Sequence, residues 1–349
     1  MECKIVADFK QGLFCIDPLY GYILGDPLEK LPSYFETWNE LAKNMPKLVE
    51  TKKLRNKVNN SIPEQLAIPW YRLSEELDLK PVLTYADVII INWRKKDENK
   101  PLELDNLRCL YNVTEGENAE WFLTVTIQIE FEFAAAIQSI LEAIQAVSDS
   151  DTPKLNRCLR EINDVILNML KVFRRMHAYV SFSISYKNRW GTEGNSLPEG
   201  LIYEGIDDKP KKLVGGSAAQ SSILQTLDAF LEIKHNKDKQ MFLDEMKGYM
   251  PKPHRDFIDA IKKSPKVRNY VLQSNQQELI ENYNTCVQNI EKFRSYHMTI
   301  VTKYVVNASS RGRREETFEK LAKRGTGGTC KFMYLFLSDI HRNGILVNY

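Results

Sequence analysis

The sequence predicts an all-α protein in which a small N-terminal domain packs on a larger helical bundle. Three long segments carry apolar residues at helical spacing: 120–147, 153–179 and 277–306. All three lie in the second part of the chain, whereas the first part mixes short apolar runs with prolines. We therefore expect a small domain over residues 1–117 and a large helical domain over residues 118–349.

Composition is typical of a globular protein and excludes several classes of function. Of the 349 residues, 43% are hydrophobic and 27% are charged, and the net charge of +2 gives no argument for a nucleic-acid partner. No apolar run reaches the roughly 18 residues that a membrane helix needs, and the N-terminus has charges where a signal peptide is apolar. The six cysteines and five histidines form no CxxC, HxH or HExxH motif, so we expect reduced cytoplasmic thiols and no zinc site.

The first part of the chain predicts short helices and no catalytic group. Ser33 can cap a helix over residues 34–59. Pro69 marks an expected turn, after which the apolar segments 73–79 and 82–93 predict two further helices. We see no catalytic constellation among these residues.

The segment 120–147 opens the strongly helical part. Its first half is β-branched, but the alanines from Ala134 onward and its length favour a helix over a strand. Glu130 and Glu132 interrupt the apolar run. Because positions two apart do not face each other on a helix, we expect one solvated and one hydrogen-bonded carboxylate, and no acid–base pair.

Two further helix starts can be placed from their capping residues. A polar turn followed by Pro153 predicts a helix that runs to about Tyr179. Later, two glycines precede Ser217, which can cap a helix from residue 218 to about 233. A glycine-rich helix entry can also present backbone N–H groups to an anion, so a plain capped helix start and an anion-binding loop both remain open for this segment.

The segment 277–306 carries the residue on which the functional prediction depends. Its apolar stripe, when extended along the helix, meets His297, so this ring should point inward among apolar neighbours. Arg294 lies three residues earlier and should share roughly the same face. A buried neutral imidazole can be an axial ligand of heme iron, and a nearby cation could meet the acidic edge of a heme. The common alternative for a lone histidine on an apolar face is a hydrogen-bonded core residue.

Three motifs occur in a characteristic order: GGSAAQSS at 215–222, RSYHMTIVTKY at 294–304 and GTGGT at 325–329. Together they resemble the indoleamine 2,3-dioxygenase family, and the similarity runs through most of the chain. That family comprises heme enzymes that open the indole ring of tryptophan, together with related heme proteins of some molluscs that only bind oxygen. The resemblance implies an all-α fold with a non-catalytic small domain and heme b as the cofactor.

The resemblance also implies roles for residues on the proximal side of the heme. His297 would be the proximal ligand of the iron. Arg294 would pair with a heme propionate, and Asp228 matches a family aspartate that orients this arginine. The physical chemistry is consistent, because a partly buried cation near a propionate needs its own positioning partner.

On the distal side, the same resemblance implies that Ser217 and Ala218 line the heme pocket. Thr326 and Gly327 would meet the ammonium and carboxylate groups of the amino acid. The implied reaction inserts both atoms of O2 across the indole C2–C3 bond of L-tryptophan or a related indoleamine and gives N-formylkynurenine, a step of the kynurenine pathway of tryptophan catabolism. We expect a cytoplasmic monomer with no nucleic-acid or membrane partner.

Two departures from the family pattern concern the distal pocket. The family has a further helical stretch between the positions of Asn60 and Ser61, and its segment between His177 and Trp190 is longer. Ile184 stands where family enzymes carry an arginine for the substrate carboxylate, and loss of such a charged partner should weaken binding by roughly 2–5 kcal/mol. The departures leave two alternatives to a dioxygenase: a myoglobin-like protein that binds O2 reversibly, and an interaction or signalling protein with little heme.

Overall fold

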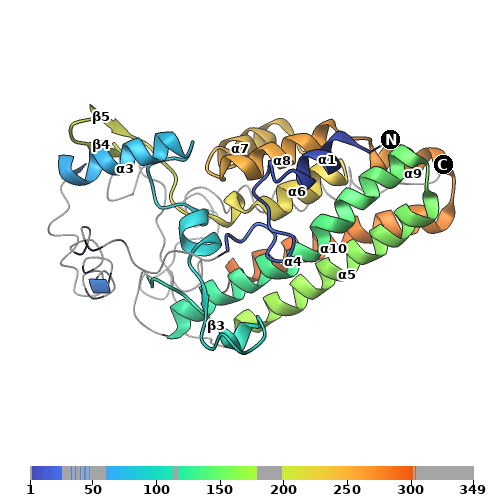
Figure 1. Ribbon diagram of the computed structural model, residues 1–349, viewed down its shortest axis with the longest axis horizontal. Coiled ribbons are helices and arrows are strands. Elements are labelled where there is room, and N and C mark those ends of the chain that lie inside the picture. The colour runs from blue at the N-terminus through green and yellow to red at the C-terminus, as the bar shows by residue number, and fades with distance from the viewer. Residues whose placement is uncertain are drawn as a thin grey trace, which may run out of the picture.

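The computed structural model describes residues 2–25, 60–112, 117–178, 199–301 and 303, together with isolated positions between 33 and 47. In these parts of the chain, long helices dominate and the strands are two to five residues long (Figure 1). The prediction of an all-α protein is confirmed. Most of the predicted helix over 34–59 lies outside the described residues.

Three long helices form the body of the molecule. Helix α4 (Glu117–Asp149) and helix α5 (Thr152–Arg174) pack along each other as a hairpin, and α10 (Gln277–Val301) packs on α5 (Figure 1). The tight connection between α4 and α5 agrees with the capping prediction, because the Asp151 side chain accepts a hydrogen bond from the Lys154 backbone at 3.0 Å and Pro153 lies in the first turn. Helix α5 ends in a 3₁₀ turn, η4 (Arg175–Ala178).

Shorter helices cover the other side of α4. Helix α6 packs on α8, and both α1 and α8 complete this layer (Figure 1). The bounds are Lys4–Lys10 for α1, Ser222–Phe230 for α6, Lys237–Lys247 for α7, Lys252–Lys263 for α8 and Val267–Ser274 for α9.

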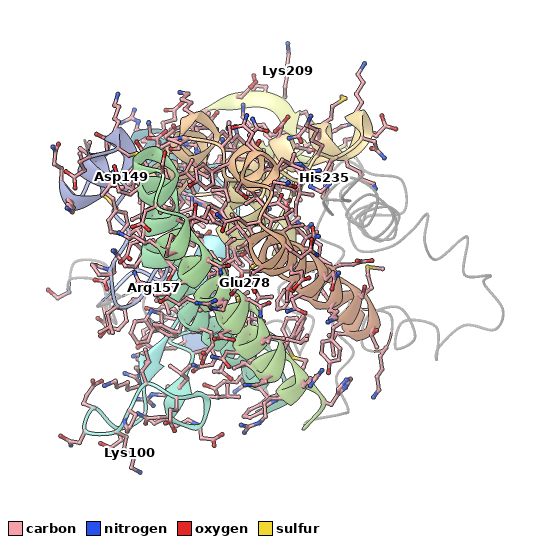
Figure 2. All side chains as sticks on the ribbon, turned by 90° about the vertical axis from the view of Figure 1, so that its right-hand side faces the viewer. Lys100, Asp149, Arg157, Lys209, His235 and Glu278 are labelled. Atoms are coloured by element: carbon pink, nitrogen blue, oxygen red, sulfur yellow. The ribbon has the colours of Figure 1, made fainter. Side chains whose placement is uncertain are left out.

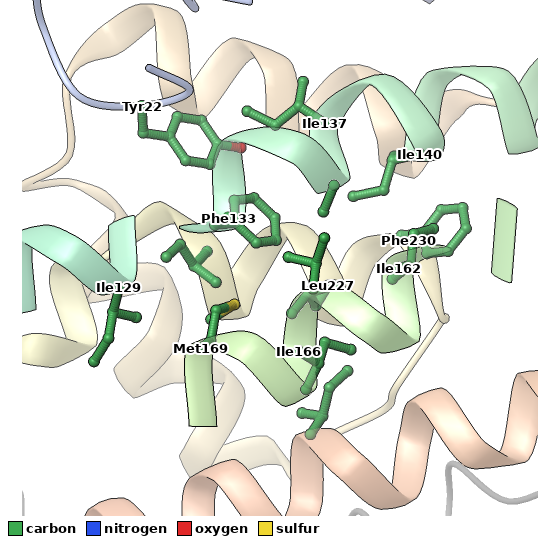
Figure 3. Close-up of a cluster of buried hydrophobic side chains, with 14 of the residues drawn as sticks. Tyr22, Ile129, Phe133, Ile137, Ile140, Ile162, Ile166, Met169, Leu227 and Phe230 are labelled. Atoms are coloured by element: carbon green, nitrogen blue, oxygen red, sulfur yellow. The ribbon is translucent and has the colours of Figure 1, made fainter. Parts of the chain in front are cut away.

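The main core lies where α4, α5 and α6 meet (Figure 3). Aliphatic side chains dominate it, and burying each one stabilises the fold by about 1.5–3 kcal/mol relative to an exposed position. The apolar periodicity of the sequence therefore predicted the buried faces of these helices correctly. The labelled members of this core are Tyr22, Ile129, Phe133, Ile137, Ile140, Ile162, Ile166, Met169, Leu227 and Phe230.

The structure corrects two helix predictions in the first part of the chain. Helix α3 (Glu64–Glu76) begins directly after Pro63 and runs through Pro69, where we predicted a turn. A proline there removes one backbone hydrogen bond, but the helix is held by packing of Ala67 against Tyr203 and its neighbours. The predicted helix over 82–93 is only a short π-helical turn, η2 (Ala86–Ile90). Helix α3 continues through Pro69 because burial of Ala67 against Tyr203 outweighs the low helix propensity of proline.

Two small sheets were not predicted. Strand β1 (Ser61–Ile62) pairs in parallel with β4 (Leu201–Tyr203), which pairs antiparallel with β5 (Asp207–Lys211). Such short strands leave no readable alternation in a sequence.

The second sheet pairs β2 (Arg94–Lys95) antiparallel with β3 (Leu107–Arg108), which follows the 3₁₀ turn η3 (Leu104–Asn106). The polar segment between these strands is largely exposed. Among the described helices, none combines the length and apolar character that a bilayer span requires.

Candidate functional site

Helix α10 presents the predicted histidine beside a buried apolar stripe. Leu279, Tyr283 and Val287 on this helix are fully buried, as the sequence pattern predicted. His297 lies two to three turns further on and is half-buried. Its ring packs against the ring of Phe173 from α5, with centroids 5.8 Å apart and planes inclined by 36°. The imidazole is therefore held between two long helices.

The chemistry of His297 fits a metal ligand of the imidazole type. Burial lowers the pKa of His297 to about 4, because a protonated ring would lose its hydration there. The ring is therefore neutral at pH 7, the form that binds iron. Within the described part of the chain, no hydrogen bond engages either ring nitrogen of His297, which leaves a lone pair available. A core histidine of the ordinary kind would instead be hydrogen-bonded.

One turn before His297, α10 carries a buried ion pair with α6. The Nη2 atom of Arg294 donates to both carboxylate oxygens of Asp228, at 2.9 and 2.7 Å. Both side chains are less than a tenth exposed. Burial alone would raise the pKa of Asp228, but the charge of Arg294 and the hydrogen bonds from His235 and Arg294 hold this pKa below its ordinary range. The structure thus places Asp228, Arg294 and His297 together at one end of the bundle.

A third group shares the Asp228 carboxylate and was missed by the sequence reading. Nε2 of His235 lies 2.9 Å from Oδ2 of Asp228, and the His235 side chain is 2% exposed. Glu232 adopts a left-handed conformation (φ 52°) just after α6, and this reverses the chain toward the aspartate. In Figure 2, His235 lies across the molecule from the loop of Lys100. On a continuous helix, residues seven apart share a face but lie about 10 Å apart along the axis, so spacing did not predict this contact, which forms because the chain turns after α6.

The distal candidates lie on the loop over 215–222. Ser217 caps the 3₁₀ turn η5 (Ala218–Gln220) and forms a capping box with the Gln220 side chain. The α-helix α6 starts only at Ser222, with Ser221 as its N-cap, so the predicted continuous helix from 218 to 233 is wrong. The cause is the second cap, which interrupts the helix after one turn. Ser217 is half-buried and Ala218 is exposed.

Glu130 on α4 is the second buried carboxyl group close to this loop. Its Oε1 atom accepts hydrogen bonds from the Tyr85 hydroxyl at 2.8 Å and from the Ser221 hydroxyl at 2.7 Å. Burial raises the pKa of Glu130 to about 7, and the two hydrogen bonds offset only part of this effect. Glu132 is only half-buried and accepts from Gln128 at 2.9 Å, so the partly solvated Glu132 and the buried, hydrogen-bonded Glu130 do not form an acid–base pair.

The remaining predicted residues are outside the site or outside the described residues. Thr326 and Gly327 lie in the undescribed C-terminal part, and Ile184 lies in the undescribed interval 179–198. His177 lies on η4, where desolvation and the charge of Lys303 lower its pKa. His254 is buried at the start of α8. Among the described residues, no cluster of histidine, cysteine, aspartate and glutamate could hold a metal ion by itself.

Comparison with known proteins identifies relatives over nearly the whole chain. A family model described as indoleamine 2,3-dioxygenase matches residues 56–341. The chain is 34% identical to indoleamine 2,3-dioxygenase 1 of Rattus norvegicus, covering 92% of this chain and 91% of the relative. It is 32% identical to indoleamine 2,3-dioxygenase 2 of Homo sapiens, covering 90% of each. It is also 30% identical to the protein named myoglobin of Haliotis madaka, covering 92% of this chain and 95% of the relative.

The length of these alignments is also informative. The alignment with the Rattus norvegicus protein extends over 372 positions, more than the 349 residues of this chain. It therefore includes positions of the relative that this chain lacks.

Proposed function

The chain belongs to the indoleamine 2,3-dioxygenase family, and on this premise we propose that it is a heme-dependent dioxygenase. It opens the indole ring of L-tryptophan or a related indoleamine and forms N-formylkynurenine, in the kynurenine pathway of tryptophan catabolism. The observation that carries the proposal is the neutral, half-buried His297 ring, whose nitrogens are engaged by no described residue, one turn from the buried Arg294–Asp228 pair. When bound, the heme supplies the activation of O2, and the protein supplies binding, orientation and electrostatics.

On the proximal side, three residues of this chain have separate tasks. His297 would ligate the iron, and its contact with Phe173 restricts rotation of the ring. Arg294 binds a propionate, and Asp228 fixes the guanidinium in place. The chain has no CxxCH motif for covalent attachment, which supports non-covalent heme b as the form of the cofactor.

On the distal side, the loop of Ser217 and Ala218 borders the face on which the indole is oriented. Exclusion of bulk water from this side by the bound heme and substrate would strengthen every polar contact there. Thr326 and Gly327 bind the ammonium and carboxylate groups of the amino acid. The matched family position for a carboxylate-binding arginine is Ile184, so we expect weaker substrate binding than in a chain with that arginine.

We also propose the wider organisation that the sequence predicted. The small domain comprises residues 1–117 and the large heme-binding domain residues 118–349, and strand β1 of the first pairs with β4 of the second. This pairing supports a small domain that packs firmly on the large one. The protein is a cytoplasmic monomer that uses neither a membrane nor a nucleic acid as partner.

A second candidate is a myoglobin-like protein that binds O2 reversibly without ring opening. The 30% identity to the myoglobin of Haliotis madaka is close to the 34% identity to the rat dioxygenase. The isoleucine at position 184 also favours this alternative, because an O2 carrier needs no group for an amino-acid carboxylate.

One experiment separates these functions. The full chain is expressed with a heme precursor, its Soret band is recorded, and L-tryptophan, O2 and a reductant are added while the absorbance of N-formylkynurenine is followed. Product formation in proportion to the heme content supports the dioxygenase. A stable oxygenated spectrum without product supports the O2 carrier, and a chain without a Soret band contradicts both and leaves an interaction or signalling protein.

A further inference from the structure

A closed ring of buried hydrogen bonds joins helix α4 to the distal loop. The Tyr85 hydroxyl and the Ser221 hydroxyl both donate to Oε1 of Glu130, at 2.8 and 2.7 Å. The Tyr85 backbone N–H donates to Oε1 of Gln220 at 2.9 Å, and Gln220 is the neighbour of Ser221. One carboxyl oxygen on α4 therefore binds two segments that are far apart in the sequence.

The same glutamine determines the shape of the distal loop. Nε2 of Gln220 donates to the Gly215 carbonyl at 2.9 Å, and the Ser217 N–H donates to Oε1 of Gln220 at 3.3 Å. Gly216 approaches Thr84 so closely that a Cβ at Gly216 would lie 3.4 Å from the Thr84 backbone. Residues 215–222 are thus fixed against the turn that starts at Thr84, and that turn is fixed to Glu130.

Only one of the two carboxyl oxygens of Glu130 takes part in this ring of hydrogen bonds. The residue is 1% exposed, and its second oxygen, Oε2, is buried and has no hydrogen-bond partner among the described residues. A buried carboxyl group with one unsatisfied oxygen is costly. Because this carboxyl group on an otherwise apolar face of α4 lowers the stability of the fold, we attribute its presence to a functional role.

We infer that Glu130 is a positioning residue for the distal side, which holds the loop of Ser217 and Ala218 at a fixed distance from α4 and hence, through α5, from the helix α10 that carries His297. The inference rests on the proposed function, because it assigns a task to Glu130 in the same site. Glu130 acts through Tyr85 and Ser221. Displacement of a pocket wall by about 1 Å can lower the rate of a reaction about a hundredfold, so such a clamp matters for turnover.

Because Glu130 can ionise, opening of the loop should depend on pH, which a contact between groups that do not ionise would not cause. With a pKa of about 7 in the closed loop and the ordinary value of 4.5 once water reaches it, Glu130 binds its proton more tightly in the closed form. Rising pH therefore favours opening of the loop, by about tenfold between pH 6 and pH 8.

Asp87 also belongs to the turn at Thr84, and burial raises its pKa. The other titratable groups around the clamp, Tyr85, Tyr22 and His254, do not contribute in this range. Burial, together with the charge of Glu130, raises the pKa of Tyr85 and of Tyr22 further above neutrality. Burial lowers the pKa of His254, whose ring packs at a tilt against Tyr22, to about 3. Tyr22, Tyr85 and His254 thus keep one protonation state each between pH 6 and pH 8.

The test is hydrogen–deuterium exchange of residues 215–222 in the heme-loaded full chain, corrected for intrinsic rates, together with kcat and KM for L-tryptophan. Glu130→Gln keeps an acceptor oxygen for Tyr85 and Ser221 and cannot ionise. We expect its exchange to be independent of pH between 6 and 8 and its kinetics at pH 6 to match the wild type. Glu130→Ala should expose the loop to exchange at both pH values and lower kcat/KM between about tenfold and a hundredfold. Glu132→Gln, two residues away on the same helix, is the matched control and should behave as the wild type.

The results that would contradict this inference differ from those that would contradict the proposed function. A wild-type loop whose exchange does not change with pH, or a Glu130→Gln variant that keeps the wild-type pH dependence, overturns the inference. If Glu130→Ala does not fold, Glu130→Gln decides the question alone. Absence of a Soret band or of product in the wild type contradicts the proposed function, whereas the exchange measurement on the same full chain needs no turnover and still decides whether Glu130 holds the loop.

Discussion

Arg294 and His235 converge on a single carboxylate oxygen: Nη2 of Arg294 lies 2.7 Å and Nε2 of His235 lies 2.9 Å from Oδ2 of Asp228. The arginine comes from α10 and the histidine from the loop between α6 and α7. Asp228 is therefore held from two sides, which restricts the guanidinium more than a simple pair would. This arrangement makes separate predictions for the aspartate and for the histidine.

Replacement of Asp228 by asparagine should destabilise the fold and weaken heme binding. The variant leaves a buried guanidinium without its counter-charge, and breaking a buried ion pair costs about 3–5 kcal/mol. Urea unfolding of the chain and titration with hemin measure the two effects. Asp256→Asn removes an exposed pair with Lys252 and should change the unfolding free energy by no more than about 1 kcal/mol. Equal effects of the two substitutions would contradict the assignment.

His235 should stabilise the aspartate through a hydrogen bond that a glutamine can replace. His235→Leu leaves Oδ2 with one donor fewer, and a hydrogen bond to a charged group contributes about 1.5–3 kcal/mol. His235→Gln carries an amide N–H and should recover most of that loss. The measurement is the unfolding free energy of both variants at pH 7, with the rate of heme loss followed at the Soret band. If leucine and glutamine are equally harmful, packing and not the hydrogen bond is responsible.

His297→Ala should abolish the Soret band of the native protein while the helical circular dichroism remains. Exogenous imidazole should restore part of the band, because it can occupy the space of the deleted ring and ligate the iron. His177→Ala is the matched control, since His177 lies near the end of the same bundle beside Tyr296. Full heme content in His297→Ala would refute the proximal assignment.

The long helices were predictable from the sequence because their periodicity reports burial directly. The stripe that includes Leu279 and Tyr283 and the cap at Asp151 are local features, and the structure contains both. The course of α3 through Pro69 was not predictable, because it depends on a strand that comes about 130 residues later in the sequence.

In the candidate site too, relations within one helix were predictable, whereas contacts between distant segments were not. Neighbouring positions on one helix, such as Arg294 and His297, could be related by spacing alone. Two contacts join different segments of the chain, and no sequence pattern predicts them: His235 with Asp228, and Glu130 with Ser221. Glu130 was visible as a charge in an apolar run, but only the fold shows what it binds.

Introduction of an arginine at position 184 should strengthen binding of L-tryptophan. In the proposed alignment, Ile184 takes the family position of a carboxylate-binding arginine, and leaving the substrate carboxylate without this partner costs roughly 2–5 kcal/mol in a pocket of low dielectric constant. Ile184→Arg should therefore lower the KM for L-tryptophan at least about tenfold, with a smaller change for an indoleamine without a carboxylate. Ile184→Gln is the uncharged control. The same gain for both substrates would argue against a carboxylate contact.

Glu130 also predicts how the stability of the whole protein depends on pH. Its pKa is about 7 in the folded chain and takes the ordinary value of 4.5 when unfolded, so the folded state binds the proton more tightly. The contribution is fully present below pH 4.5 and is lost as pH rises through about 7, with a total of about 3 kcal/mol. Asp228 acts in the opposite direction and only in acid, because its pKa is lowered and its contribution disappears as pH falls through that value.

Urea unfolding at pH 5, 6, 7 and 8 checks this dependence. The wild type should lose stability steadily from pH 5 to pH 7 and then level off, because Glu130 is fully ionised above its pKa. Glu130→Gln should show a flatter profile over the same interval, since its side chain stays neutral, whereas Glu132→Gln should run parallel to the wild type. A profile of Glu130→Gln that parallels the wild type would mean that another group titrates, and Glu130 would then be charged in the folded protein at all four pH values.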